Sequence, residues 1–232
     1  MRSDFNDLMI TIKHEKPTVI LLTGKIGSGK DYIASTIIHE LQDSYDICKL
    51  SFAGEIKRIF RKLFRIYELN VSGTNVTNML YTALRNDLIK LIGSANISIN
   101  ETKFNLLLDK FEEILVSHNV YNKKLMRECY YIISNDIARK NDQNIWTRCL
   151  YNKIELIRQY VDFIVVPDCR KLYEYNFMMS AYNIILVYID SDVKTRAERR
   201  KVTVKEILEM DNWEFEREID MLKDYADFII QN

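Results

Sequence analysis

A short glycine-rich segment, GKIGSGKDY at residues 24–32, has the residue types and spacing of a phosphate-binding loop. Its three glycines leave the backbone free to turn, so that several N–H groups converge on one point. Lys30 could reach the β- and γ-phosphates of a bound nucleotide. The usual pattern continues with Ser or Thr, whose hydroxyl binds Mg²⁺, but here that position is Asp31. A carboxylate is itself a good hard ligand for Mg²⁺, so Asp31 can serve the same metal.

A second candidate segment is FIVVPDCRKLYE, residues 163–174. An apolar strand ends there with Asp168, at the edge of the sheet where doubly wound folds bind their ligands. Asp168 is therefore a candidate for the metal shell or for a base. Arg170 could clamp a phosphate or the acceptor. Without the glycine loop, an ordinary strand-to-helix turn would be the better explanation of this pair.

A third segment, DVKTRAERRK at residues 192–201, contains three arginines at helical spacing. Arg196, Arg199 and Arg200 share one helical face by the i, i+3, i+4 rule. Such a run is usually a solvated face. Its place between two predicted strands instead favours an arginine-bearing lid, at about residues 190–203, that closes over transferring phosphates.

The elements that must position these residues follow from the apolar pattern. Continuous apolar runs predict buried parallel strands at 18–23, 163–168, 184–189 and 228–230, and the alternation of Cys48, Leu50 and Phe52 predicts a further one. At least one helical segment separates each strand from the next. We therefore expect an α/β fold with a doubly wound, five-stranded parallel sheet, which is typical of P-loop kinases.

The chain divides by pattern into a core and an insertion. Residues 1–17 are polar and are expected to form an N-terminal arm. Residues 18–69 and 126–232 carry the strand-and-helix pattern of the core. Residues 70–125 show helical stripes and no clear strand, so we expect a helical insertion that binds the acceptor.

Composition limits the function classes. Lys plus Arg and Asp plus Glu both total 33, so no global field recruits nucleic acid or an anionic membrane. The four cysteines lack the spacing of a zinc site or a disulfide framework, which favours a reducing, cytoplasmic compartment. No apolar run reaches the roughly 18 residues of a membrane span. We expect neither a nucleic-acid nor a membrane partner.

The segments together resemble the bacteriophage deoxynucleoside monophosphate kinases, with animal phosphomevalonate kinases as more distant relatives. Both families have a G-x-x-x-S-G-K-D loop, which GKIGSGKD matches through Ser28 and Asp31. The segment LSFAGEIKR, residues 50–58, looks like the strand-A-G-P-I-K element of the phage kinases and implies a substrate role for Lys57, with Glu55 in place of the proline. DYADFIIQN at the C-terminus resembles the last strand of nucleotide kinases, which lies near the adenine.

A longer segment, RECYYIISNDIARKNDQNIW at residues 127–146, resembles the family's R-x-x-x-Q-x-x-G-T-D-x-x-R motif ahead of a tryptophan. Its Gln is Tyr131 here, and its Gly-Thr pair is Ser134-Asn135. With Lys57 and Arg170, the resemblance implies that the substrate-binding residues here are Arg127, Tyr131, Asp136, Arg139 and Trp146.

The resemblance implies a kinase that moves the γ-phosphoryl group of ATP, with Mg²⁺, to a deoxynucleoside monophosphate. The resemblance to the phage kinases also implies that the protein forms a homodimer and that, if it is viral, it is located in the host cytoplasm. Two alternatives stay open: a phosphomevalonate-type small-molecule kinase, and a non-catalytic ATP-binding interaction protein. The expected catalytic residues are Lys30, Asp168, Arg170, Arg196, Arg199 and Arg200. The expected metal ligands are Asp31 and Asp168. The nucleotide-binding set is Gly24, Lys25, Gly27, Ser28, Gly29, Lys30, Asp31 and Tyr32.

Overall fold

The computed structural model describes residues 17–70, 75–117, 122–213 and 216–232. The expected N-terminal arm, apart from Pro17, lies outside these ranges. The chain divides into two compact units. The sheet unit comprises the described residues up to Phe52 and those from Leu150 to Asn232, and the helical unit is Ala53–Cys149.

The sheet unit is built on five parallel strands in the order β2-β3-β1-β4-β5. This confirms the predicted fold class and all five strands. The strands are β1 (Thr18–Thr23), β2 (Ile47–Lys49), β3 (Phe163–Val166), β4 (Asn183–Asp190) and β5 (Phe228–Gln231). The helices of this unit are α2 (Lys30–Leu41), α9 (Leu172–Ala181), α10 (Val193–Arg200), α11 (Val204–Asp211) and α12 (Ile219–Lys223), together with the second half of α8 (Ile145–Ile157).

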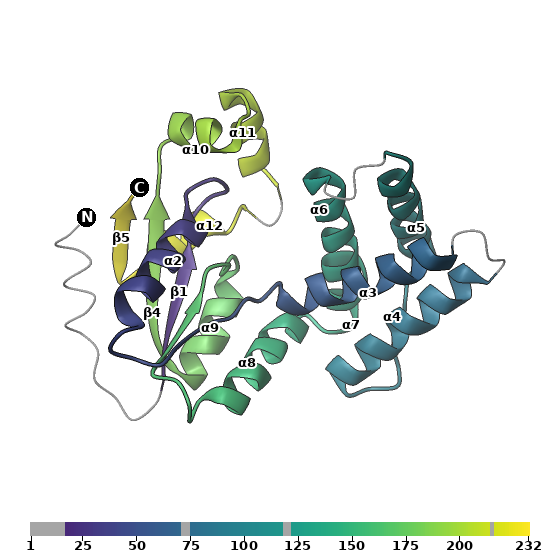
Figure 1. The fold of residues 1–232 in the computed structure, drawn as a ribbon, viewed down its shortest axis with the longest axis horizontal. Helices are drawn as coiled ribbons and strands as arrows, with labels where there is room; N and C mark the ends of the chain where they lie inside the picture. The colour runs from purple at the N-terminus through teal and green to yellow at the C-terminus, as the bar shows by residue number, and fades with distance from the viewer. Residues whose placement is uncertain (1–16, 71–74, 118–121, 214–215) are drawn as a thin grey trace. The chain divides into compact units, whose positions relative to one another are not determined.

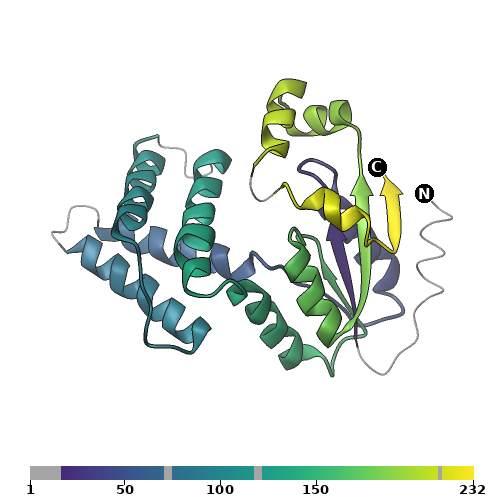
Figure 2. The ribbon, with the colours of Figure 1, turned by 180° about the vertical axis from the view of Figure 1, so that it is seen from behind.

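Both faces of this sheet are covered by helices. The connections β1–α2–β2 and β3–α9–β4 run in opposite directions along the sheet, so right-handed crossovers place their helices on opposite faces. Figure 1 shows α2 in front of the sheet, and Figure 2 shows α9 and α12 in front when the molecule is seen from behind. Ile20 and Leu22 of β1 pack in the core on the α2 side of the sheet, whereas Val19 and Leu21 pack in the core on the α9 side. The carboxyl end of β1, between β3 and β4, is the switch point where doubly wound folds bind ligands.

Two strands end earlier than the sequence predicts. β2 stops at Lys49, although the N–H of Leu50 still donates to the carbonyl of Val165 at 3.0 Å. Phe52 has left the sheet and is buried in the core beneath it, so its burial mimics a strand position in the sequence. β3 stops at Val166, because Pro167 has no N–H to donate to the ladder.

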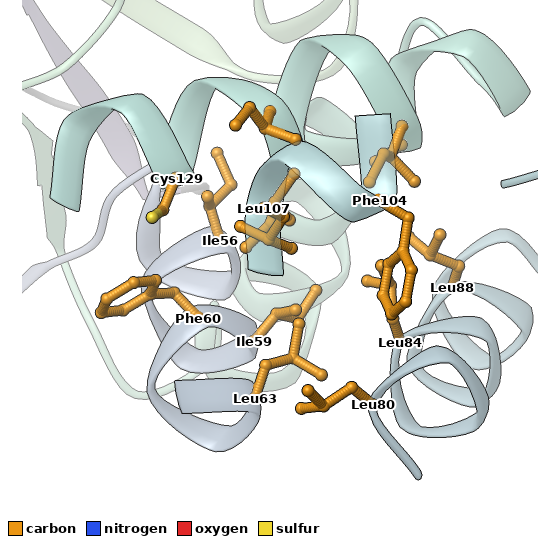
Figure 3. Packing of buried hydrophobic residues seen from close by; sticks show 14 of the residues in the cluster. Ile56, Ile59, Phe60, Leu63, Leu80, Leu84, Leu88, Phe104, Leu107 and Cys129 are labelled. Atoms are coloured by element: carbon orange, nitrogen blue, oxygen red, sulfur yellow. The ribbon is translucent and has the colours of Figure 1, made fainter. Parts of the chain in front are cut away.

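The helical unit has its own hydrophobic core (Figure 3). Its helices are α3 (Gly54–Asn70), α4 (Val76–Ile92), α5 (Glu101–Val116), α6 (Lys123–Tyr131), a π-helix (Ile132–Ala138), α7 (Arg139–Asn141) and the start of α8. Ile56, Ile59 and Leu63 of α3 form the buried stripe that the sequence predicts, and they face α4 and α5. The unit is wider than the expected insertion at 70–125, because α3 shares its core with those helices.

Within the described ranges, no helix has both the length and the hydrophobicity to span a membrane.

Candidate functional site

The glycine loop joins β1 to α2 and has the backbone of an anion cradle. Gly24, Gly27 and Gly29 all have positive φ, at 136°, 81° and 92°. Gly24 is needed for space as well, since a Cβ there would clash with the carbonyl oxygen of Ile189. The loop ends at the N-terminus of α2, where N–H groups without an intrahelical partner and the helix dipole favour negative charge.

Lys30 begins α2, and its amine is folded back onto the loop. Its Nζ donates to the carbonyls of Gly24 and Lys25, the latter at 2.9 Å, and lies 3.5 Å from Ser28 Oγ. The residue is 8% exposed. Burial, and next the charge of Arg170, lower the pKa of Lys30 from 10.5 to about 7. A polyphosphate in the loop would supply the negative charge that the amine lacks.

The predicted lid helix, α10, packs directly on this loop, so all three arginines meet it. Arg196 Nη1 donates to the carbonyl of Ile26 at 3.3 Å, and Arg199 Nη1 to that of Ser28 at 3.3 Å. The Cγ of Arg200 lies 3.1 Å from where a Cβ on Gly27 would stand. The three arginines therefore lie on the side of α10 that faces the glycine loop, as their i, i+3, i+4 spacing predicts.

Arg196 differs from the other two because it is 3% exposed and forms an ion pair. Its two terminal nitrogens pair with both oxygens of Asp211 in α11, at 2.7 and 2.8 Å. This hydrogen-bonded pair raises the pKa of Arg196. The residue joins α11, α10 and the loop, and Arg199 and Arg200 are better placed to meet a ligand.

Asp168 lies two residues beyond the end of β3 and is held by the segment that follows β2. Its Oδ2 accepts from Ser51 Oγ at 2.6 Å, and its Oδ1 accepts from the N–H of Phe52 at 3.0 Å. The N–H of Cys169 donates to the carbonyl of Leu22 at 3.3 Å, which ties this loop to β1. The fold thus fixes one carboxylate near the glycine loop.

Asp31, the unusual residue of the loop, points outward and is 88% exposed at its side chain. Its Oδ1 lies 3.3 Å from Nζ of Lys49, at the end of β2. Among the described residues, no three His, Cys, Asp or Glu side chains gather into a metal cluster. Mg²⁺ needs no such cluster, because it binds one or two carboxylates together with water and substrate phosphate. Asp31 and Asp168 fit that mode.

The remaining residues of the glycine loop and of the start of α2 are placed as follows. Lys25 pairs through Nζ with Asp220 of α12 at 3.0 Å, and Tyr32 is 67% exposed on α2. Ser28 is buried, and its carbonyl accepts from Asn232 Nδ2 at 2.8 Å. The segment after β5 therefore touches the loop from the side opposite to Asp168 in the strand order.

Sequence reasoning missed two charged residues of this site, Lys49 and Glu216. Glu216 is fully buried, accepts from the N–H of Ile26 at 2.9 Å and pairs with Arg170. It is 190 residues from Ile26 in the chain, so no local pattern could reveal the contact. Lys49 is the last residue of β2, and Asp168 lies just beyond the end of β3, so its place at the carboxyl end of a strand was the available signal.

The expected acceptor residues other than Arg170 lie in the helical unit. The π-helix occupies much of their segment, and this rare form is frequent at functional sites. Asp136 pairs with Lys103 at 3.0 Å, Arg139 donates to Asn135, and Lys57 is exposed on α3. Arg127 and Tyr131 are half-buried on α6.

Trp146 is the exception among these acceptor residues. It is 1% exposed within the hydrophobic core of the helical unit, and its indole N–H has no hydrogen-bond partner. In the described structure its ring is therefore not exposed to a bound substrate.

Comparison with known proteins gives only distant similarity. No protein-family model and no curated protein sequence matches the chain. Among solved structures, TT1252 from Thermus thermophilus has a TM-score of 0.42 at 12% identity, over 95% of this chain and 90% of that one. APE1195 has a TM-score of 0.37 at 14% identity, over 94% and 86%. Similarities this distant support no argument about function.

Proposed function

We propose that the protein transfers the γ-phosphoryl group of ATP to the phosphate of a (deoxy)nucleoside monophosphate, releasing ADP and the diphosphate. One observation carries the phosphoryl-transfer part. The buried amine of Lys30 is enclosed by a loop of three positive-φ glycines, against which a helix bearing three arginines packs. An ordinary turn before a helix needs none of these. The nucleotide acceptor rests on the sequence resemblance to phage deoxynucleoside monophosphate kinases.

The chemistry asks for positioning and charge neutralisation. The bond from the γ-phosphorus to its bridging oxygen breaks, ADP departs, and a bond forms to an oxygen of the acceptor phosphate. That oxygen is already ionised, so no general base is required. Lys30 holds the β- and γ-phosphates, and Arg199 and Arg200 neutralise the group in transfer. Arg196 keeps α10 on the loop.

Mg²⁺, when bound with the nucleotide, neutralises charge on its phosphates. Asp31 and Asp168 are the residues that would hold the ion or its waters. Asp31 is the more accessible of the two, because its side chain is exposed while both oxygens of Asp168 already accept hydrogen bonds.

On the acceptor side, the resemblance assigns the acceptor phosphate to Arg170, Arg127 and Arg139. The nucleoside is then recognised by the remaining residues of this set, Lys57, Tyr131 and Asp136. These assignments predict that changes in the helical unit alter the KM of the acceptor without altering that of ATP.

The deciding experiment measures ADP formation from ATP and Mg²⁺ with each common nucleoside and deoxynucleoside monophosphate in turn, and with phosphomevalonate. Lys30→Ala should abolish it, whereas Lys194→Ala, at an exposed position of α10, should not. Arg139→Ala should raise only the acceptor KM.

The results of this assay distinguish the three possible functions. ADP formed only in the presence of one monophosphate supports the proposal and names the acceptor. Turnover with phosphomevalonate alone replaces the nucleotide acceptor by that substrate. Tight ATP binding with no acceptor turned over sinks the kinase and leaves a nucleotide-binding interaction protein.

A further inference from the structure

Three acids in the segment just before and within α12 pair with three cations of the site loops. Asp220 pairs with Lys25 of the glycine loop at 3.0 Å, and Glu218 with Lys171 at 3.1 Å. Glu216 pairs with Arg170. The acids alternate along the chain, so one short segment neutralises cations from the loops that follow β1 and β3.

Glu216 differs from the other two in burial. The side chains of Asp220 and Glu218 are 63% and 38% exposed, whereas that of Glu216 is 0% exposed. A charge removed from water is costly unless partners satisfy it, so its two contacts must be well formed. An acid that served only solubility would lie with its neighbours at the surface.

The two oxygens of Glu216 bind different loops. Oε2 accepts from the backbone N–H of Ile26 at 2.9 Å, in the middle of the glycine loop. Oε1 accepts from Nη1 of Arg170, two residues after Asp168. One carboxylate therefore spans the loop expected to bind the donor phosphates and the arginine expected to bind the acceptor phosphate.

We propose that Glu216 is a positioning residue, which fixes the guanidinium of Arg170 relative to the glycine loop and so aligns the donor and acceptor phosphates. The kinetic part of this inference rests on the proposed function. Glu216 itself touches no phosphate and acts through Arg170. A loss of alignment lowers kcat more than it weakens ATP binding, since Lys30 and the glycine backbone are unchanged.

The first test compares Glu216→Gln with Glu218→Gln. The glutamine keeps an oxygen that can accept from Ile26 but removes the charge that pairs with Arg170. We expect kcat to fall about 10- to 100-fold, with the KM of ATP changed less than about threefold. Glu218→Gln, on the same segment, should leave both constants near wild type. A loss of the same size in the two variants would overturn the proposal.

The second test asks whether Glu216 acts through Arg170. If it does, Glu216→Gln combined with Arg170→Gln should be no slower than Arg170→Gln alone. Fold-losses that multiply in the double variant would show independent roles and reject the inference.

A third measurement needs no nucleotide, so it separates this inference from the kinase proposal. Amide hydrogen exchange of Ile26 should accelerate at least about tenfold in Glu216→Ala, because the amide loses its acceptor. Glu218→Ala should leave that rate unchanged. Unchanged exchange at Ile26 in Glu216→Ala would refute the positioning role, whatever substrate the protein has.

Discussion

Arg196 and Asp211 form a two-pronged ion pair, with Nη1 to Oδ1 at 2.7 Å and Nη2 to Oδ2 at 2.8 Å. Because the pair is almost wholly buried, it holds α11 against α10 and keeps α10 on the glycine loop. An arginine that the sequence groups with the phosphate ligands thus has a structural partner, which joins α11 to α10.

Removing the charge of Asp211 should therefore destabilise the fold. Asp211→Asn is expected to lower the free energy of unfolding by about 3 kcal/mol, because a buried guanidinium then lacks its counter-charge. Urea unfolding measures this change. Glu209→Gln, at an exposed position of the same helix, should stay within about 0.5 kcal/mol of wild type. Equal stability of the two variants would contradict a structural role for the pair.

The glycines allow a prediction that separates backbone strain from steric clash. Gly93, which ends α4, has φ of 74° and open space around its Cβ position, so Gly93→Ala should cost only about 1 kcal/mol. Gly24→Ala adds the clash with Ile189 and should cost about 3 kcal/mol. Thermal unfolding of both variants tests the order.

The same two variants also test whether the glycine loop binds a nucleotide. Gly24→Ala should abolish binding of ADP with Mg²⁺ in calorimetry, because the loop must shift to admit the methyl group. Gly93→Ala should bind as wild type does. Wild-type affinity in Gly24→Ala would mean that the loop is not the nucleotide site.

The contacts of Asp168 predict graded losses of activity. Asp168→Asn should reduce kcat by at least about 100-fold, since it removes the charge of a proposed Mg²⁺ ligand. Ser51→Ala removes one hydrogen bond to that carboxylate and should cost about tenfold. Ser35→Ala, which loses only a hydrogen bond to the Asp31 carbonyl on an exposed helix face, is the control. Steady-state ADP formation ranks the three, and a Ser51→Ala enzyme as active as the control would dissociate Ser51 from the site.

The lowered pKa of Lys30 predicts that the protein takes up a proton when it binds a nucleotide. Burial, and next Arg170, lower its pKa to about 7, while Asp31 and Asp168 oppose that shift. Bound phosphates favour the charged amine and raise the pKa, so binding at pH 8 should take up a proton and affinity should fall as the pH rises above about 7.

Calorimetry of ADP with Mg²⁺, in buffers of different ionisation enthalpy at pH 8, measures this uptake. Lys30→Arg stays charged throughout and should show none from this position. Uptake of the same size in Lys30→Arg would assign the proton to another group.

The sequence by itself determined the α/β class, the five strands and the loop that follows the first of them. Buried parallel strands are continuous apolar runs, and tight turns need glycine, so both are local properties of the chain. The stripe of α3 was readable for the same reason, since it repeats every three or four residues. The ends of strands were less predictable from the sequence. Phe52 is buried beneath the sheet, and its apolar side chain extends the alternating pattern beyond the end of β2.

Only the tertiary structure decided which partners the charged residues take. Arg196 meets Asp211 rather than solvent, and Glu216 joins Ile26 to Arg170 across 190 and 46 positions of the chain. The burial of Trp146 depends on packing between helices in the same way. A local pattern fixes which face of an element a residue occupies, but the residue across from it comes from another element. That choice is made when the elements pack.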